Sequence, residues 1–376
     1  MQLTLMMGQI VPVPVSATVA EALASVTVTR SGSATSTFQL QFNADRASPL
    51  AIPDFPMLFD RLTAVGSRVI VSVTMDAQET VLIDGIITTQ ELGHQRETGM
   101  STISVTGEDL SILMDMTEEA FSYPGFGDMT IVLLLLEKYA VHGIVPATIP
   151  TLTGEVTDPL EDVPQQNETD RACIKRLADK HGYVFLMLPG PVAGANVAYW
   201  GPPLRLSVPQ SALTVDMGHA TNVETISFVY NGLAAQTFIG ETYDPEVDEI
   251  FPVDTLLSLR VPPLAAEPAL PFQALFVKTN LYTDSRWDEA DALAFAQSQT
   301  DNSVDNVVTV NGTLDTFRYG QIIDAPGLIG VRGAGMTNDG IYYVDSVTHT
   351  IARGSYSQAF SLTREGQMTT VPVVLT

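Results

Sequence analysis

Two stretches that lie far apart in the chain can be aligned with each other. Residues 84–109 read DGIITTQELGHQRETGMSTISVTGED, and residues 339–365 read DGIYYVDSVTHTIARGSYSQAFSLTRE. At one offset Asp84 falls on Asp339 and His94 falls on His349, and "ISVT" then meets "FSLT" after a slip of two residues. Each stretch has the pattern of a strand, a glycine-containing turn and a second strand. The alignment predicts that one small β-domain occurs twice; chance similarity is the alternative, because Asp-Gly pairs and turn glycines are common.

A duplicated β-domain has a consequence for assembly. A chain with two similar units that forms a trimer presents six similar units around a ring, so it can dock on a six-fold object. A closed ring also covers the strand edges that an isolated small sheet leaves exposed.

Composition limits the class of protein. The 376 residues are 45% hydrophobic, which fits two or three globular domains. The 43 acidic residues outnumber the 18 Lys and Arg and give a net charge of -25, which argues against stable binding of nucleic acid. The single cysteine excludes an intramolecular disulfide and fits a reducing cytoplasm. The longest apolar run, around residues 130–136, is too short to cross a bilayer, and the N-terminus lacks a signal-peptide pattern.

The pattern along the chain predicts an α+β fold that is mainly β. Two tube-like antiparallel β-barrel or sandwich domains are expected to flank a mixed α/β domain. The first β-domain covers residues 1–115, where Phe38, Leu40 and Phe42 alternate with polar residues. Its further strands are expected at 68–75, 80–89 and 102–106, followed by a short helix that opens at Asp109.

The mixed domain is expected at residues 116–215. Asp128 can cap a buried helix that runs to about Val141 and ends at Gly143. A second helix lies in "NETDRACIKRLADKHGYVFLM", residues 167–187, with Asn167 as its N-cap and Gly182 as its end. A strand at 183–188 should follow and pair with residues 197–200.

The second β-domain is expected at residues 216–376. Its strands are predicted at 223–230, 307–310 and 342–364. Ser285 and Asp288 have the spacing of a capping box for a helix that carries Trp287 and Leu293. Residues 241–271 are acidic and rich in proline, which predicts a long loop outside the core.

The histidines and the cysteine do not form a recognisable reactive site. His94, His142, His181, His219 and His349 never occur at the spacing of a helical metal site. His142 and His181 each precede a glycine at an expected helix end, where an imidazole can bond the last carbonyls. Cys173 has Arg171, Lys175 and Arg176 nearby but no partner pattern of a catalytic thiol, so we expect a packed apolar residue.

Two further features resemble sites only superficially. Residues 330–340, GVRGAGMTNDG, lack the Lys-Ser/Thr of a phosphate-binding loop and are expected to form a flexible loop before a hairpin. Close acidic pairs such as Glu118 with Glu119, or Asp244 with Glu246, are more typical of solvated surfaces than of acid-base catalysis. We therefore expect no catalytic, cofactor-binding or metal-binding residues.

The sequence resembles the phage late-control-D and baseplate-hub family of contractile phage tails and contractile injection systems. The resemblance rests on residues 167–187, on the closing hairpin from Gly340 to Gly366, and on "VTVNGTLDTFRYGQIIDAPGLIGVRGAG", residues 308–335. It spans about residues 22–366 and is most specific in the last third. The helix-glycine-strand segment at 167–187 would then be part of the scaffold.

The resemblance implies a structural protein rather than an enzyme, without cofactors. It implies a homotrimeric hub whose pseudo-hexameric ring lines the channel and adapts the six-fold tail tube to the three-fold spike. Expected partners are a tail tube or tube-initiator protein on one side, a separate trimeric spike protein on the other, and baseplate wedge components. DNA or an effector would pass through without stable binding, and the chain would not insert into a membrane. The expected location is the baseplate of a virion or particle that is assembled in the bacterial cytoplasm.

Two other functions remain as alternatives. The acidic stretch 241–254 motivates a tail-associated cell-wall or glycan hydrolase, which would need a cleft with a carboxylate of raised pKa. A monomeric carbohydrate-binding adhesin module would need exposed aromatic platforms. If part of the net charge of -25 faces a channel, it would keep DNA or an acidic effector from adhering during ejection.

Overall fold

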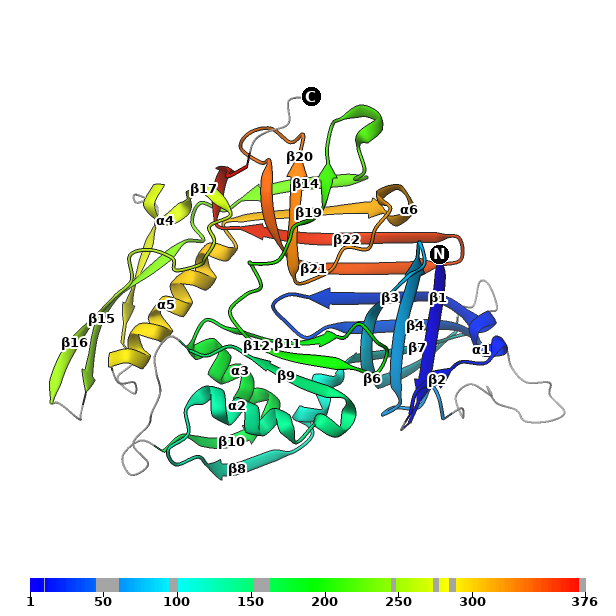
Figure 1. Ribbon diagram of the computed structural model, residues 1–376, viewed down its shortest axis with the longest axis horizontal. Coiled ribbons are helices and arrows are strands. Elements are labelled where there is room, and N and C mark those ends of the chain that lie inside the picture. Colours follow the sequence, from blue (N-terminus) through cyan, green and yellow to red (C-terminus); the bar gives the residue numbers. More distant parts are fainter. Residues whose placement is uncertain are drawn as a thin grey trace.

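The computed structural model describes residues 1–9, 11–44, 61–94, 101–151, 163–244, 248–272, 277–283 and 289–371. Within these ranges the protein has one 13-stranded sheet and four smaller sheets, with a few helices (Figure 1). This confirms the predicted class, a mainly β fold of the α+β type. No helix of the described ranges is both long and apolar enough to cross a membrane.

The first part of the large sheet is a unit of strands in the order β3-β4-β7-β6-β5-β1, which we call unit 1. Alternating side chains of β4 face its core, where Phe38 is 3% exposed and Leu40 and Phe42 are fully buried. The expected short helix is η2, which Asp109 caps through the backbone N–H of Ser111. The elements are β1 (Gln2–Gly8), β2 (Val13–Pro14), α1 (Ala17–Ala22), β3 (Leu23–Ser31), β4 (Thr37–Ala44), β5 (Arg68–Met75), β6 (Gln78–His94), β7 (Ser101–Asp109) and η2 (Leu110–Asp115).

The C-terminal part of the sheet, unit 2, has strands in the order β14-β19-β22-β21-β20-β13. Its core includes Phe360 and Leu362, which lie on one face of β22 as predicted. The elements are β13 (Gln210–Thr214), η4 (Gly218–Ala220), β14 (Thr225–Tyr230), β19 (Val308–Asp315), α6 (Thr316–Tyr319), β20 (Gly327–Arg332), β21 (Gly340–Ala352) and β22 (Ser355–Arg364).

The two units have the same arrangement of strands. Taken in chain order, β3, β4, β5, β6 and β7 occupy the places of β14, β19, β20, β21 and β22. The β6–β7 and β21–β22 hairpins both contain a register shift on their first strand. The units differ at one end, where β1 is antiparallel to β5 but β13 is parallel to β20. The common order favours duplication over chance similarity.

The units join edge to edge in one continuous sheet (Figure 1). β21 of unit 2 pairs antiparallel with β3 of unit 1, with Ser346 opposite Ser31 and Ala352 opposite Ser25. We call this pairing the unit junction.

In the sequence, a further segment separates the two units. Its helices α2 and α3 pack around Trp200, which is fully buried and donates from Nε1 to the carbonyl of Ile174 at 3.3 Å. β11 pairs antiparallel with β12, as predicted. The division of the chain at residues 115 and 215 stays a prediction. The elements are β8 (Glu118–Ser122), α2 (Asp128–Glu137), η3 (Ala140–His142), β9 (Ile144–Thr148), β10 (Gln165–Thr169), α3 (Asp170–Lys180), β11 (Val184–Pro189) and β12 (Asn196–Gly201).

Three predicted helix boundaries in this segment are wrong. Thr169, not Asn167, caps α3, because Asn167 is drawn into β10 opposite Ala120 of β8. Asp128 is the first residue of α2 rather than its cap, and α2 ends at Glu137, so residues 140–142 form the separate helix η3. Gly182 follows the end of α3 with a positive φ angle, as predicted, whereas Gly143 ends η3 rather than α2.

The expectation of a long loop at residues 241–271 is also wrong. This stretch completes a three-stranded sheet, β16-β15-β18, which packs on α5 around the buried Val253, Tyr282 and Ala296. The predicted capping box at Ser285 and Asp288, with Trp287, lies outside the described residues. The elements are β15 (Gln236–Asp244), β16 (Glu249–Asp254), β17 (Ala265–Pro268), α4 (Ala269–Phe272), β18 (Lys278–Tyr282), α5 (Glu289–Asp305) and β23 (Gly366–Thr369).

Candidate interaction surfaces

One face of the large sheet carries mostly uncharged polar side chains across both units, although Glu91, Glu108 and Asp315 also lie on it. Its opposite face buries the apolar cores, so successive residues of each strand alternate between core and solvent. We call the solvent side the neutral face. It comprises Ser25, Thr27 and Thr29 on β3, Thr37, Gln39, Gln41 and Asn43 on β4, Thr102, Ser104 and Thr106 on β7, Ser346, Thr348 and Thr350 on β21, Ser355, Ser357, Ala359 and Ser361 on β22, and Thr309, Asn311 and Thr313 on β19.

Hydrogen bonds between neighbouring strands order the neutral face. The hydroxyls of Thr29 and Thr348 lie 3.0 Å apart across the unit junction. Gln39 donates from Nε2 to the Ser104 hydroxyl at 2.8 Å. A hollow of about 330 Å³ lies in this face, between the unit junction and the end of β7. Glu108 also lines this hollow and pairs with Arg171 at 2.8 Å. The hydroxyl and amide groups of the face offer neither a strong cation nor a strong anion to a passing ligand.

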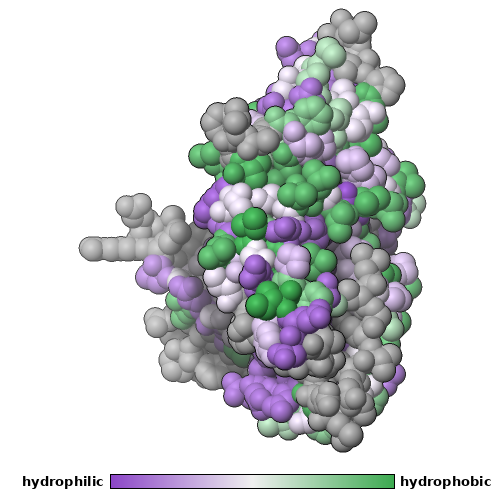
Figure 2. Space-filling model, turned by 90° about the vertical axis from the view of Figure 1, so that its left-hand side faces the viewer, coloured by the Kyte–Doolittle hydropathy of each residue, from purple (hydrophilic) through white to green (hydrophobic). Residues whose placement is uncertain are grey.

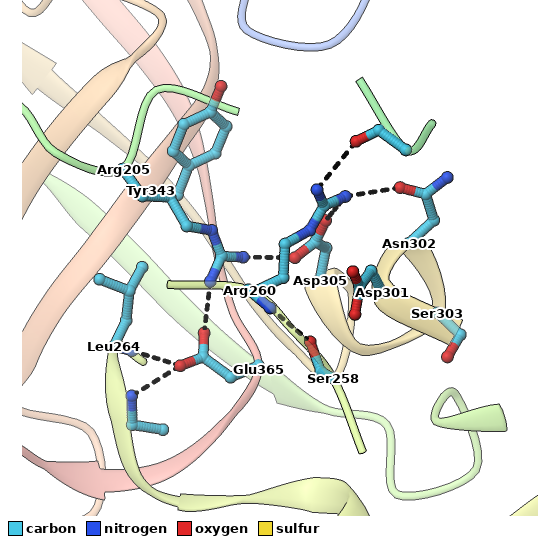
Figure 3. A network of polar contacts seen from close by, with 12 residues as sticks. Arg205, Ser258, Arg260, Leu264, Asp301, Asn302, Ser303, Asp305, Tyr343 and Glu365 are labelled. Atoms are coloured by element: carbon cyan, nitrogen blue, oxygen red, sulfur yellow. Dashed lines mark hydrogen bonds and ion pairs between the residues drawn. The ribbon is translucent and has the colours of Figure 1, made fainter. Parts of the chain in front are cut away.

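A buried ionic network ties the connection after β12 to unit 2 (Figure 3). Arg205 pairs with Asp305 of α5 and, at 3.1 Å, with Glu365. Arg260 reaches Asp305 at 3.0 Å and donates to the Gly182 carbonyl at 2.9 Å. Charges that are paired and hydrogen-bonded in this manner fix geometry rather than perform chemistry.

The same network holds Glu365, the carboxylate that lines a nearby cavity. A cavity of about 200 Å³ is lined mostly by apolar groups such as Leu257, Leu270 and Val304. Its carboxylate, Glu365, also accepts hydrogen bonds from the backbone N–H groups of Leu264 and Ala265. A carboxylate with all these donors is poorly suited to act as a general acid.

A second buried network joins three helices. Asp128 of α2 bonds Lys180 at 2.9 Å and His181 at 2.8 Å at the end of α3, and Lys180 also pairs with Asp291 of α5 at 2.6 Å. Burial alone would raise the pKa of Asp128, but His181 and the charge of Lys180 outweigh it and lower the pKa to about 2. His181 therefore links α3 to α2, where a cap on its own helix is expected from the sequence.

The other residues considered in the sequence lie apart from one another. Cys173 is 1% exposed in the core around α2 and α3, as predicted, and burial raises its thiol pKa to about 11. His349 is fully buried at the unit junction, whereas His94, His142 and His219 are exposed. In the described part of the chain, no three His, Cys, Asp or Glu side chains form a group that could hold a metal ion.

The glycine-rich and acidic stretches have structural roles. Residues 330–332 belong to β20, and the loop that follows is held by Arg364, which donates to the carbonyls of Thr337 and Asp339. The predicted loop before a hairpin is therefore residues 333–339, which precede β21 and β22. Glu118 and Glu119 lie on the exposed strand β8, and Glu119 pairs with Lys138. The side chains of Asp244 and Glu246 lie outside the described residues.

The sequence analysis missed an exposed apolar surface on the arm formed by β15, β16 and β18. Figure 2 shows hydrophobic side chains over much of the face that carries this arm. Ile250 is 64% exposed and Leu281 is 71% exposed, and the chain just after β16 exposes further apolar residues, Leu256, Leu257, Leu259 and Val261. The many leucines and valines among the prolines of residues 250–264 were the available signal.

No family model and no curated protein matches the sequence. Solved structures match its fold over nearly the whole chain. A tail protein from Neisseria meningitidis MC58 is 13% identical with a TM-score of 0.64, over 96% of this chain and 97% of that one. The 43 kDa tail protein of prophage MuSo2 from Shewanella oneidensis is 15% identical with a TM-score of 0.63, over 96% and 98%.

A third similar structure comes from a secretion machine. It is an Escherichia coli component of the type VI secretion system, described as similar in structure to T4 bacteriophage tail proteins. It is 13% identical with a TM-score of 0.53, over 90% of this chain and 73% of that one. At these identities the comparison establishes a shared fold. The chain thus has the fold of these tail proteins.

Proposed function

We propose that this protein is the structural hub of the baseplate of a contractile tail or injection system. Three copies would form a pseudo-hexameric ring that adapts a six-fold tail tube to a three-fold spike. The observation that carries the proposal is the repeated strand order within one continuous sheet, because it supplies two similar units from every copy. The fold shared with the Neisseria and Shewanella tail proteins supports the same class of function.

The neutral face is the best candidate for the channel lining. It runs across both units and the unit junction with few charged side chains, so it would be continuous around a ring built from such units. A neutral hydroxyl surface attracts neither phosphates nor cations, and a passing polymer would therefore not adhere. In this proposal the lining consists mainly of hydroxyl and amide groups, whereas the sequence analysis expects acidic groups there.

The partners follow from the ends of such a ring. One end would contact the tail tube or a tube-initiator protein, and the other a separate trimeric spike protein, with baseplate wedge components outside. The exposed apolar arm, including Ile250 and Leu281, is a candidate contact for one of these proteins. The particle would be assembled in the bacterial cytoplasm.

The rival functions have less support. The acidic stretch 241–254 forms most of an exposed hairpin, β15–β16, and does not line the cavity of about 200 Å³. The aromatic side chains that an adhesin would need, such as Phe121, Tyr243 and Phe317, are exposed on separate elements, β8, β15 and α6.

Quantitative mass spectrometry and immunogold labelling of purified particles test the proposal. We expect three copies of this protein for every six subunits of one tube ring, and gold particles at the spike end of the tube. A stoichiometry of six, or labelling along the whole tube, would contradict the hub function. Absence of the protein from the particles would refute it altogether.

A further inference from the structure

The sheet of the arm, β16-β15-β18, is covered by a helix on one side only. α5 packs on its inner face, where Val253 and Tyr282 are buried. We propose that the opposite face binds a basic amphipathic helix of another protein. This inference rests on the proposed function only in placing that protein in the particle. We call this side the outer face; it carries Ile239, Glu241 and Tyr243 on β15, Ile250 and Asp254 on β16, and Leu281 on β18.

Strand registers place these residues on one side of the sheet. Successive residues of a strand alternate between its two sides, and residues that lie directly opposite each other on neighbouring strands share a side. Tyr243 lies opposite Ile250, and Ile239 lies opposite both Asp254 and Leu281. They alternate along their strands with the buried residues that face α5.

The centre of the outer face is apolar although it faces solvent. Leu281 is 71%, Ile250 64%, Ile239 51% and Tyr243 46% exposed. An antiparallel sheet usually carries polar residues on its solvated side, and strands in a parallel pair, such as β15 and β18, are usually covered on both sides. Large apolar side chains at adjoining positions of such a sheet indicate a surface that a partner covers.

Carboxylates border this apolar centre. Glu241 lies between two of its apolar residues on β15, and Asp254 lies on β16 opposite Ile239. Within the described part of the chain, neither carboxylate forms an ion pair. Residues 236–259 contain six acidic residues and no Lys or Arg. An apolar surface with this border is complementary to a partner whose apolar stripe is flanked by Lys or Arg.

A second copy of this chain is a poor occupant of the outer face. Each copy carries a net charge of -25, so two copies repel each other. Among the described helices α3 has the most Lys and Arg, but three of its four cations, Arg171, Arg176 and Lys180, pair with carboxylates of their own chain. The complementary surface therefore belongs to a different, basic protein.

The shape of the outer face fits a helix better than an added strand. With strands about 4.8 Å apart, the outer two lie about 10 Å from each other, close to the diameter of a helix with its side chains. Pro252 in the middle of β16 has no N–H to donate, which disfavours pairing of a further strand at that edge. A helix on the outer face would complete a layered structure in which the sheet lies between two helices.

The arm is ordered before any partner binds. The hydroxyl of Thr255, just after β16, lies 2.6 Å from that of Thr300 on α5. The backbone N–H of Gln236 at the start of β15 donates to the Ser303 hydroxyl of α5 at 2.9 Å. A surface that is already fixed loses little conformational entropy when a partner binds.

Peptide binding by the full-length protein tests the inference. The probe is a fluorescein-labelled synthetic helix of about 18 residues, or five turns, with a stripe of Leu flanked by Lys. The matched control peptide has Glu in place of every Lys. In fluorescence anisotropy at low ionic strength, we expect one basic peptide to bind per chain and the acidic peptide to bind at least about 10-fold more weakly.

Variants locate the binding site. Ile250→Thr/Leu281→Thr should weaken binding of the basic peptide at least about 10-fold, and Glu241→Gln/Asp254→Asn about 5-fold with a smaller dependence on salt. The control Val145→Thr changes a valine outside the arm that is 59% exposed, and it should bind like the unmodified protein. Failure of the basic peptide to bind, equal binding of both peptides, or binding that Ile250→Thr/Leu281→Thr leaves unchanged would overturn the inference.

Further outcomes separate this inference from the proposed function. If Ile250→Thr/Leu281→Thr dissociates a trimer in native mass spectrometry, the outer face is a contact between copies, so the basic partner is wrong while the hub stands. If the peptides and variants behave as expected but the protein is absent from purified particles, the outer face does bind a basic helix and the proposed function fails.

Discussion

The buried histidine at the unit junction should make the protein sensitive to mild acid. His349 is fully buried, its Nδ1 lies 3.0 Å from the Tyr356 hydroxyl, and its Nε2 has no hydrogen-bond partner among the described residues. Burial, helped by the charge of Arg30, lowers its pKa from 6.5 to about 3. At pH values between these two, His349 is protonated in the unfolded chain and neutral in the folded chain. Stability must therefore fall as the pH falls below about 6.5.

The size of the effect follows from the width of the pH interval. Between pH 7.5 and pH 5.5 this single group should remove about 1.4 kcal/mol from the free energy of unfolding. The assay is urea unfolding, followed by tryptophan fluorescence and circular dichroism, at both pH values for the unmodified protein and for His349→Gln.

The comparison between variants isolates the histidine. Other groups that titrate contribute equally to both proteins, so the unmodified protein should lose about 1.4 kcal/mol more than His349→Gln over this interval. His219→Gln, at an exposed position, serves as the control for replacing a histidine by glutamine. An equal loss of stability in the unmodified protein and His349→Gln would refute the reasoning.

Three further predictions concern the segment between the units. Cys173, with its thiol pKa raised to about 11 by burial, should react with a disulfide reagent at pH 8 about 100-fold more slowly in the folded protein than in denaturant; equal rates would contradict its burial. Trp200→Ala should cost about 3–5 kcal/mol in urea unfolding, because it empties the centre of a packed core, and a loss below about 1 kcal/mol would be inconsistent with that position. Asp128→Asn should lower the free energy of unfolding by about 3 kcal/mol at pH 7, since it removes the buried carboxylate that pairs with Lys180, and Asp291→Asn should cost less because Asp291 is more exposed. Because the pKa of Asp128 is lowered to about 2, its carboxylate should stabilise the fold above about pH 4, and this contribution should be lost as the pH falls towards about 2. Acid unfolding of the unmodified protein, compared with the two variants, can check this.

The strands of the two units could be predicted where only one face is buried. β4 and β22 alternate core and solvent residues, and β5 was placed at residues 68–75 without error. The two aligned hairpins also revealed the duplication. The strand order could not be obtained this way, because it depends on pairings between residues more than 300 positions apart, such as Thr29 with Thr348.

The errors arose where local signals compete with long-range contacts. Asn167 and Thr169 are both good helix caps, and only the pairing of β10 with β8 decides between them. Acidic residues and prolines at 241–271 are typical of loops, yet Val253 and its neighbours gain enough burial against α5 to form a sheet. The network of Arg205 with Glu365 joins residues 160 positions apart, so no spacing in the sequence signals it.

The central claim is that two equivalent units per chain let three copies imitate a six-membered ring. A cryo-electron microscopy reconstruction of the assembled ring, with only three-fold symmetry imposed, measures this most directly. The account predicts that unit 1 superimposes on unit 2 by a rotation of about 60° around the ring axis, with the neutral face towards the channel. Units at different distances from the axis, or a channel lined by another face, would contradict it.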